Sequence, residues 1–289
     1  MWFFLALFSA TLLSFRRVGE KQLSTKLNHF TIGWLVQLLS LPFMVVALLG
    51  AGTLLNPFEL GLAFWLPLLI IWLVIYPLHT IGYFKAFRHG QLSNVLPIHS
   101  LIPAMSLLLA WVVAGEKPSV IGTLAVLAIV AGVYVMNLKG RRLHNPFKPF
   151  LEDTSTLYML LSSVALALGG VLDKVAVKAS EPLFYNVVNT IGAVGVLYVA
   201  ARLLRVRECG AVRQNLSALV TVGTLQGFAY TAYLVALSLG PVAYVVSIRS
   251  GNVLIGTLIG VWFLREEFTR AKTLGFAFIL VGFALLAVG

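Results

Sequence analysis

The sequence predicts an all-α membrane protein of ten transmembrane helices arranged as two inverted five-helix repeats. The first observation is composition, because 60% of the 289 residues are hydrophobic and only 11% are charged. Soluble domains carry about 25% charged residues. The second observation is a repeat, because residues of the first half recur in the second half at a constant spacing of 150 positions. Two like halves in an apolar chain are typical of secondary transporters.

Ten apolar segments are long enough to cross a bilayer, which takes about 20 helical residues. They lie at residues 2–22, 30–50, 61–84, 92–114, 119–138, 156–178, 183–204, 216–238, 242–264 and 271–288. The polar stretch between the fifth and sixth segments contains two prolines, which favours a linker over a helix. The sequence therefore predicts a first five-helix repeat over 1–140, a linker over 141–154 and a second five-helix repeat over 155–289.

The repeat is visible at polar and glycine positions, which seldom coincide by chance. The matching pairs include Tyr83 and Tyr233, Gly90 and Gly240, Ser100 and Ser250, Glu116 and Glu266, and Gly132 and Gly282. Upstream, Glu20-Lys21 precedes Asp173-Lys174 by about one repeat. Because each repeat has an odd number of spans, the second must enter the membrane from the opposite side, and the repeats are expected to be inverted.

The basic residues indicate orientation rather than nucleic-acid binding. The net charge is +11, but these residues are scattered among short loops between apolar spans. Loops after even-numbered spans, together with the ends of those spans, hold only Lys117, Lys174 and Lys178. Cytoplasmic loops carry an excess of Lys and Arg, so the loops after odd-numbered spans are predicted to be cytoplasmic and both termini external. The expected location is the inner or plasma membrane, with many crossings.

Short segments of both halves point to a family. The second half contains Ala236-Leu237-Ser238-Leu239-Gly240-Pro241, followed by Glu266, Gly275 and Gly282. The first half contains Ala86-Phe87-Arg88-His89-Gly90, followed by Pro103, Glu116 and Gly132. With the ten spans and the repeat, this pattern resembles the EamA-type branch of the drug/metabolite transporter superfamily over essentially the whole chain. One departure is Val253, which stands where the first half has Pro103. The resemblance implies a proton- or gradient-driven carrier, or an exchanger, of small metabolites.

A basic residue deep in a span is the first candidate for substrate binding. Arg249 lies well inside the ninth span, and its repeat equivalent in the fourth span is His99. A charged group in hydrocarbon costs about 2.5–3.5 kcal/mol on insertion scales, so it is retained mainly where it faces a cavity. Guanidinium can hold a carboxylate or phosphate in a bidentate pair, which predicts an anion site. A structural ion pair is the alternative.

Polar and aromatic stripes on two other spans are the second set of candidates. Tyr76, His79 and Tyr83 share one face of the third span, and Gln226, Tyr230 and Tyr233 share one face of the eighth. Asn186 and Asn189 lie in the seventh span. These side chains could line a route for a planar or amphipathic solute. Packing between helices, with the polar groups bonded to neighbours, is the alternative.

Four acidic residues have possible roles in coupling or capping. Asp173 and Glu20, near the ends of the sixth and first spans, are candidates for a carboxylate that takes protons during transport. Adjacent opposite charges near an interface are otherwise simply solvated. Glu116 and Glu266 end the fourth and ninth spans at matched positions, where capping of short hairpins is expected.

The sequence thus predicts a secondary transporter, as a carrier, exporter or exchanger, that moves an anionic or amino-acid-like metabolite by alternating access. A channel-like protein or a non-transporting membrane scaffold is the alternative. No enzyme motif is present, and neither a cofactor nor a metal is expected. The expected partners are a small-molecule substrate and the lipid bilayer, and the chain is expected to be a monomer or a homodimer.

Overall fold

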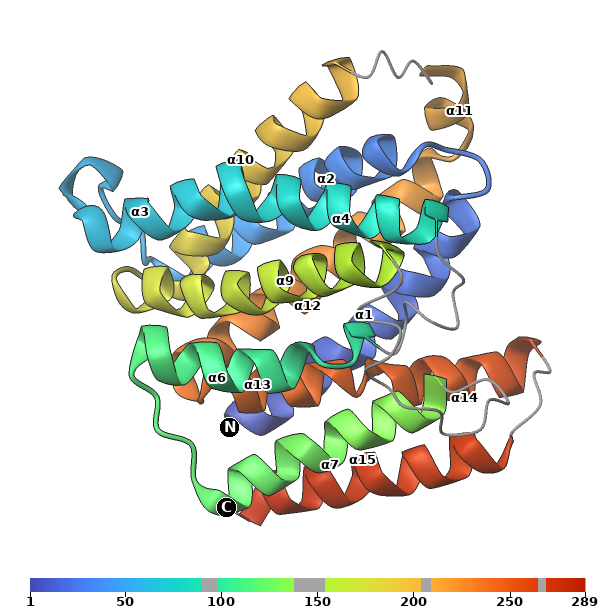
Figure 1. Ribbon diagram of the computed structural model, residues 1–289. Helices are drawn as coiled ribbons and strands as arrows, with labels where there is room; N and C mark the ends of the chain where they lie inside the picture. The colour runs from blue at the N-terminus through green and yellow to red at the C-terminus, as the bar shows by residue number, and fades with distance from the viewer. Residues whose placement is uncertain (90–97, 138–153, 204–208, 265–268, 289) are drawn as a thin grey trace. The chain divides into compact units, whose positions relative to one another are not determined.

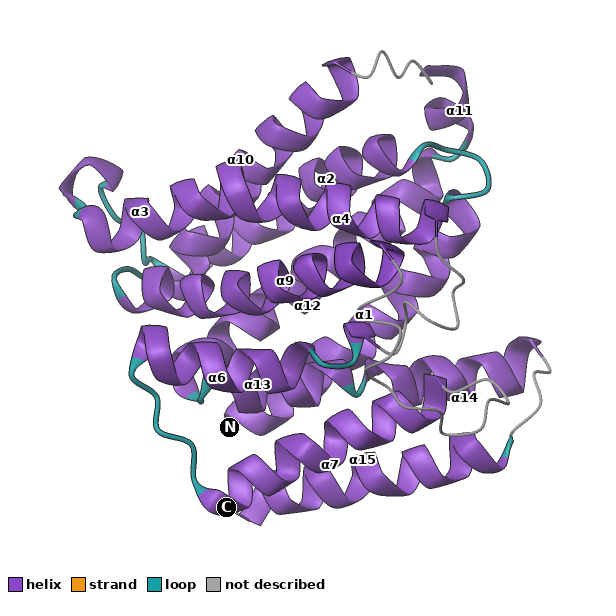
Figure 2. Cartoon of the chain, in the orientation of Figure 1, coloured by secondary structure: helices purple, strands orange, loops and turns teal. Residues whose placement is uncertain are grey.

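The computed structural model describes residues 1–89, 98–137, 154–203, 209–264 and 269–288, and these residues are almost entirely helical (Figures 1 and 2). The α-helices are α1 (Trp2–Leu23), α2 (His29–Ala51), α3 (Leu62–Ile70), α4 (Tyr76–His89), α6 (Ile102–Ala114), α7 (Val120–Asn137), α9 (Thr154–Lys178), α10 (Pro182–Leu203), α11 (Cys209–Gln214), α12 (Leu216–Leu239), α13 (Val242–Ser250), α14 (Asn252–Leu264) and α15 (Arg270–Val288). A 3-10 helix, η1, spans Pro57–Glu59, and a π-helical segment, η2 (Ile71–Ile75), joins α3 to α4. Residues 141–153 of the predicted linker, Gly90 and Glu266 lie outside the described residues, and Thr154, the last residue of that linker, begins α9.

The helices have the length and composition of membrane spans. Within the described residues, seven helices are long and apolar enough to cross a bilayer. Three shorter apolar helices, Ile102–Ala114, Val120–Met136 and Val242–Leu258, lie where the sequence predicts the fourth, fifth and ninth spans. The prediction of an all-helical, multi-pass membrane protein is therefore confirmed.

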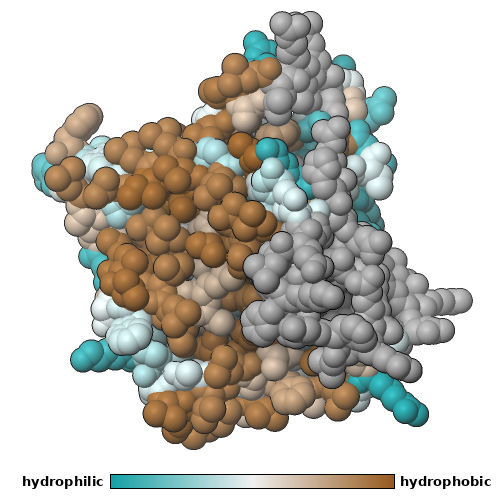
Figure 3. Space-filling model, in the orientation of Figure 1, coloured by the Kyte–Doolittle hydropathy of each residue, from teal (hydrophilic) through white to brown (hydrophobic). Residues whose placement is uncertain are grey.

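Large apolar side chains are exposed along many of these helices. Phe4 is 73% exposed, Leu73 68% and Val112 77%. Figure 3 shows apolar side chains over much of the visible surface. A soluble monomer seldom exposes a contiguous apolar patch of more than a few hundred Å². In a multi-pass membrane protein, such side chains are expected to face lipid tails.

The chain forms two compact units, and each unit combines segments from both predicted repeats. Unit 1 comprises residues 1–73 and 173–239, and unit 2 comprises residues 74–172 and 240–289. The chain passes between them within η2, within α9, and between α12 and α13. In unit 1, α1 packs along α12, and α2 packs along both α10 and α12. In unit 2, α7 packs along α15, and α13 packs on α6.

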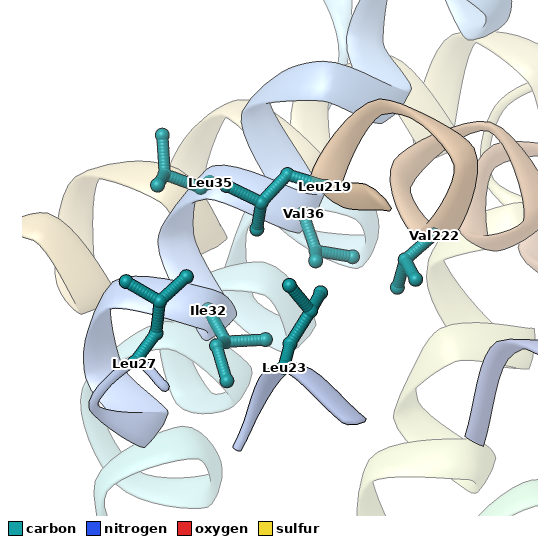
Figure 4. Packing of buried hydrophobic residues seen from close by; sticks show 7 residues of the cluster. All are labelled: Leu23, Leu27, Ile32, Leu35, Val36, Leu219 and Val222. Atoms are coloured by element: carbon teal, nitrogen blue, oxygen red, sulfur yellow. The ribbon is translucent and has the colours of Figure 1, made fainter. Parts of the chain in front are cut away.

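An apolar cluster joins three segments of unit 1 (Figure 4). Its members are Leu23, Leu27, Ile32, Leu35, Val36, Leu219 and Val222.

Asn28 begins α2, because its side-chain oxygen accepts a hydrogen bond from the Phe30 amide at 2.9 Å. Further along, α12 approaches α2 closely at Gly223, where a Cβ would lie 2.8 Å from Cβ of Leu39. The glycine sets the distance between these two helices.

The contact between α7 and α15 in unit 2 is made by repeat-equivalent residues of the two helices. A Cβ on Gly132 would lie 2.6 Å from Cγ1 of Ile279, and a Cβ on Gly282 would collide with Cγ1 of Ile129. Gly282 is the repeat equivalent of Gly132, and Ile279 is the repeat equivalent of Ile129. The same two contacts are therefore made with the roles of the two helices exchanged.

A serine hydroxyl bridges two helices in each unit. In unit 1, Ser9 Oγ of α1 donates to the carbonyl oxygen of Ala229 in α12 at 2.6 Å. In unit 2, Ser162 Oγ of α9 donates to the carbonyl oxygen of His79 in α4 at 3.2 Å. Ala229 follows His79 by the same number of residues as Tyr233 follows its repeat equivalent Tyr83. Ser162 likewise follows Ser9 by the same number of residues as Asp173 follows Glu20. The two hydrogen bonds are repeat equivalents.

Candidate functional site

A buried carboxylate is the centre of a polar cluster in unit 1. Asp173 is only 8% exposed, and the adjacent Lys174 is 5% exposed. Tyr185 of α10 donates its hydroxyl to Oδ1 of Asp173 at 2.5 Å. The hydroxyl of Tyr230 in α12 lies 3.4 Å from Oδ1 and 3.3 Å from Oδ2 of the same carboxylate. Hydrogen bonds to a charged acceptor are about twice as strong as neutral ones, so these phenols stabilise the buried carboxylate.

The hydrogen bonds continue from this carboxylate to the π-helical segment. Asn189 Nδ2 donates to the Tyr230 hydroxyl at 2.9 Å, and Trp72 Nε1 donates to Asn189 Oδ1 at 3.0 Å. An indole nitrogen can only donate, so Asn189 must direct its carbonyl to Trp72 and its amino group to Tyr230. Tyr230 then donates its hydroxyl hydrogen to Asp173. The chain of hydrogen bonds from Trp72 through Asn189 and Tyr230 to Asp173 is called the relay below. Each of its donors points toward the carboxylate, and hydrogen bonds aligned in this way polarise one another.

One face of α10 positions the relay. Tyr185, Asn189 and Gly192 are separated by four and three residues, so they lie on the same side of the helix. Tyr185 is fully buried and Asn189 is 1% exposed. A Cβ on Gly192 would collide with the Trp72 ring, so only glycine at this position of α10 leaves room for the indole. Trp72 itself lies in η2, and π-helical segments occur frequently at functional sites.

Two further side-chain amides form hydrogen bonds in the same unit. Asn186 Nδ2 donates to Thr231 Oγ1 at 2.8 Å, and Gln226 Nε2 donates to Gln37 Oε1 at 3.3 Å. Asn186 is 1% exposed and Gln226 is 4% exposed. Their own side-chain carbonyl oxygens have no hydrogen-bond partner in the part of the chain that the structure describes. These carbonyl oxygens are acceptors available to another polar group.

The predicted histidine and tyrosine candidates of the third span lie in unit 2. His79 Nδ1 is 2.8 Å from Ser162 Oγ. The His79 ring is 5.7 Å from the Tyr83 ring, and the Tyr83 ring is 6.1 Å from the ring of His99. Tyr76 begins α4 and is half-buried. The structure thus groups His79, Tyr83 and His99 in unit 2, whereas Tyr230 and Gln226 belong to unit 1.

The fourth and ninth spans are interrupted beside the two predicted basic residues. Arg249 is the penultimate residue of α13, and Gly251 separates α13 from α14. His99 is followed by a turn at residues 100–101, and α6 begins at Ile102. A Cβ on Gly251 would collide with the Phe283 ring, which explains glycine at that break. Discontinuous helices of this kind form the ion and substrate sites of many transporters.

The other predicted acidic residues have different surroundings. Glu20 pairs with Arg16 one helical turn earlier in α1, with 2.6 Å between Oε1 and Nη2, and both side chains remain about a quarter exposed (23% and 28%). Glu116 caps a helix of the other sequence half, because its Oε2 accepts a hydrogen bond from the Val242 amide at the start of α13. No group of three or more His, Cys, Asp or Glu side chains that could hold a metal ion occurs among the described residues.

Sequence reasoning missed Tyr185, Trp72 and Thr231. A single aromatic residue in an apolar span usually indicates packing, so composition gave no reason to select Trp72 or Tyr185. One signal was available for Tyr185, because it lies one helical turn before Asn189 on the same face. Nothing in the sequence indicates that Trp72 reaches Asn189, which is 117 residues away.

The long apolar helices define a multi-pass membrane protein. The chain belongs to the EamA-like transporter family, whose pattern matches residues 1–138 and 154–288. This family comprises membrane transporters of small molecules, which are generally not enzymes. A crystal structure of a protein that is 15% identical to this chain has the same fold, with a TM-score of 0.76 over 99% of this chain and 95% of that one. No curated protein matches the chain.

Proposed function

We propose that this protein is a secondary transporter that moves a small metabolite by alternating access, with ten spans in two inverted five-helix repeats. The repeats correspond to residues 1–140 and 155–289, joined by the linker 141–154. The observation that carries this proposal is the pair of equivalent serine bonds, Ser9 to Ala229 and Ser162 to His79. Each unit contains one of them, so each unit joins a helix of one repeat to a helix of the other in the same way.

In each unit a helix of one repeat is bonded to a helix of the other, and alternating access by inverted repeats uses such equivalent units. If both units are built from equivalent contacts, rocking one against the other interconverts two states of similar energy, one open to each side. The contact of Gly132 with Ile279 and of Gly282 with Ile129 supports the same two-fold relation. Counterflow in proteoliposomes tests the proposal, because a carrier exchanges labelled for unlabelled substrate and its flux saturates. Flux without saturation would indicate a channel, and absence of flux would indicate a scaffold.

We propose that the substrate's negative group binds at the interrupted spans, where Arg249 and His99 are located. The fixed charge of arginine cannot be removed by deprotonation, and its planar guanidinium matches a carboxylate or phosphate. Arg249→Ala is expected to abolish uptake while the protein still inserts, and Arg249→Lys to bind more weakly because the bidentate contact is lost. Uptake is compared at equal membrane levels. Unchanged uptake by Arg249→Ala would exclude the anion site, whereas loss of membrane protein would assign Arg249 to a structural ion pair.

We propose that Asp173, rather than Glu20, is the carboxylate that couples transport to protons. Asp173 is buried within a hydrogen-bond network, whereas Glu20 is partly exposed and has Arg16 as a partner. The titratable side chains that face Asp173 in unit 1 include Tyr185 on α10 and Tyr230 on α12, whose ring stacks on that of Tyr233, and Lys174 is its neighbour on α9. Amide substitution removes the site of proton uptake and keeps the shape of the side chain.

The expected result is that Asp173→Asn loses proton-driven accumulation but retains exchange. Glu20→Gln serves as the matched control, because it changes the repeat-equivalent acid in the same way. Accumulation and counterflow are measured on the same proteoliposomes. Full accumulation by Asp173→Asn would exclude a coupling role, and equal losses in both variants would indicate a general structural effect.

We propose an inner- or plasma-membrane location with both termini outside the cytoplasm, as the distribution of basic loops predicts. Single cysteines at Asn56 and Asn145, introduced after Cys209→Ser, test this orientation. An impermeant thiol reagent added to intact cells is expected to label position 56 but not position 145. The reverse pattern would invert the topology, and labelling of both positions would contradict the assignment of spans between them.

A further inference from the structure

The His79 side chain and its own carbonyl share one partner, Ser162. Ser162 Oγ lies 2.8 Å from Nδ1 of the His79 ring and 3.2 Å from the backbone oxygen of His79. A serine hydroxyl has a single proton, so it can donate in only one of these directions and must accept in the other. The direction of the hydroxyl therefore decides which ring nitrogen of His79 carries hydrogen.

The repeat-equivalent bond in unit 1 shows the direction. There, Ser9 Oγ donates to the carbonyl oxygen of Ala229, and the alanine methyl group offers no competing acceptor. Ser9 and Ser162 are both fully buried, and both reach the carbonyl of the equivalent residue on the neighbouring helix. With the same direction at Ser162, the hydroxyl proton goes to the His79 carbonyl. The Ser162 oxygen then accepts from Nδ1–H of His79.

A histidine that donates through Nδ1 has a lone pair at Nε2 when it is neutral. Nε2 of His79 has no hydrogen-bond partner among the described residues. The centroid of the His79 ring lies 5.7 Å from that of the Tyr83 ring, which in turn lies 6.1 Å from that of the His99 ring. An acceptor on a ring within an aromatic cluster matches a planar group that carries an N–H or O–H.

We propose that His79 is a neutral Nδ1–H tautomer whose Nε2 accepts a hydrogen bond from an N–H or O–H group of the transported substrate. This rests on the proposed transport function for the identity of the ligand, but not for the state of the ring. A lone pair repels an anionic group, so this subsite takes the donor end of the substrate and not its negative end. A substrate that also satisfies Arg249 then carries both a negative group and a hydrogen-bond donor.

Nuclear magnetic resonance of protein labelled with ¹⁵N-histidine tests the tautomer directly. The signal of His79 is identified by its loss in His79→Asn, with His79→Gln as a second assignment variant. At neutral pH we expect the correlation pattern of an Nδ1-protonated neutral ring. Ser162→Ala should disturb that pattern, because the ring loses its acceptor, whereas Ser9→Ala should leave it unchanged. An Nε2-protonated or doubly protonated ring in the wild type would overturn the proposal.

The ligand chemistry is tested with pyrrole, a planar neutral donor, against N-methylpyrrole, which has the same shape without the N–H. Pyrrole should shift the Nε2 signal of His79 in a saturable way, and N-methylpyrrole should not. His79→Gln keeps an acceptor near the Nε2 position and should retain pyrrole binding, whereas His79→Asn should lose it. Equal effects of both probes would overturn the donor assignment. None of these readouts depends on flux, so they separate failure of this inference from failure of the transport function.

Discussion

Replacing Asn189 by leucine tests whether the relay from Trp72 to Asp173 stabilises the fold. The substitution keeps the number and branching of the side-chain heavy atoms but removes both the acceptor of the Trp72 indole and the donor to Tyr230. An unsatisfied buried donor costs about 1–3 kcal/mol in soluble proteins. Hydrogen bonds between membrane helices average about 0.6 kcal/mol and reach about 1.7 kcal/mol. We therefore expect Asn189→Leu to lower the free energy of unfolding by roughly 1–3 kcal/mol, since two bonds are lost.

A double-mutant cycle isolates the bond between Asn189 and Trp72. Trp72→Phe removes the indole N–H, so Asn189→Leu should cost less in that background, with a coupling of about 0.6–1.7 kcal/mol. The matched control is Trp65→Phe, because Trp65 Nε1 donates to the Pro57 carbonyl at 3.2 Å and takes no part in the relay. Unfolding is followed in mixed micelles with increasing denaturing detergent. Additivity with Trp72→Phe, or equal coupling with Trp65→Phe, would refute the reasoning.

Two further substitutions test individual contacts by the same unfolding measurement. Gly192→Ala places a methyl group against the Trp72 ring and should cost about 1–3 kcal/mol, whereas Gly195→Ala on the same helix meets no atom within 4 Å and should cost far less; equal costs would contradict the packing argument. Glu116→Ala removes the cap on the Val242 amide and should cost about 0.5–2 kcal/mol, while Glu116→Gln retains an acceptor and should recover most of it. No recovery with glutamine would assign the effect to the charge.

Membrane insertion and helical structure could be predicted from the sequence because both depend on local properties. In a bilayer the backbone must satisfy its own hydrogen bonds, so a long apolar segment folds as a helix wherever it is placed. The family could also be inferred, since the spaced glycines and polar residues of the two halves are visible without coordinates. The interruption at Gly251 was not predicted, because it depends on how Phe283 of a neighbouring helix packs there.

The different surroundings of Asp173 and Glu20 were decided by tertiary structure alone. In sequence the two acids look alike, since each precedes a lysine near the end of an apolar span. In the folded chain, Asp173 receives hydrogen bonds from tyrosines of α10 and α12, whereas Glu20 pairs with Arg16 on its own helix. The pairing of Glu20 is an (i, i+4) contact that sequence spacing can predict. The surroundings of Asp173 depend on which distant helices pack beside it, and local sequence does not contain that information.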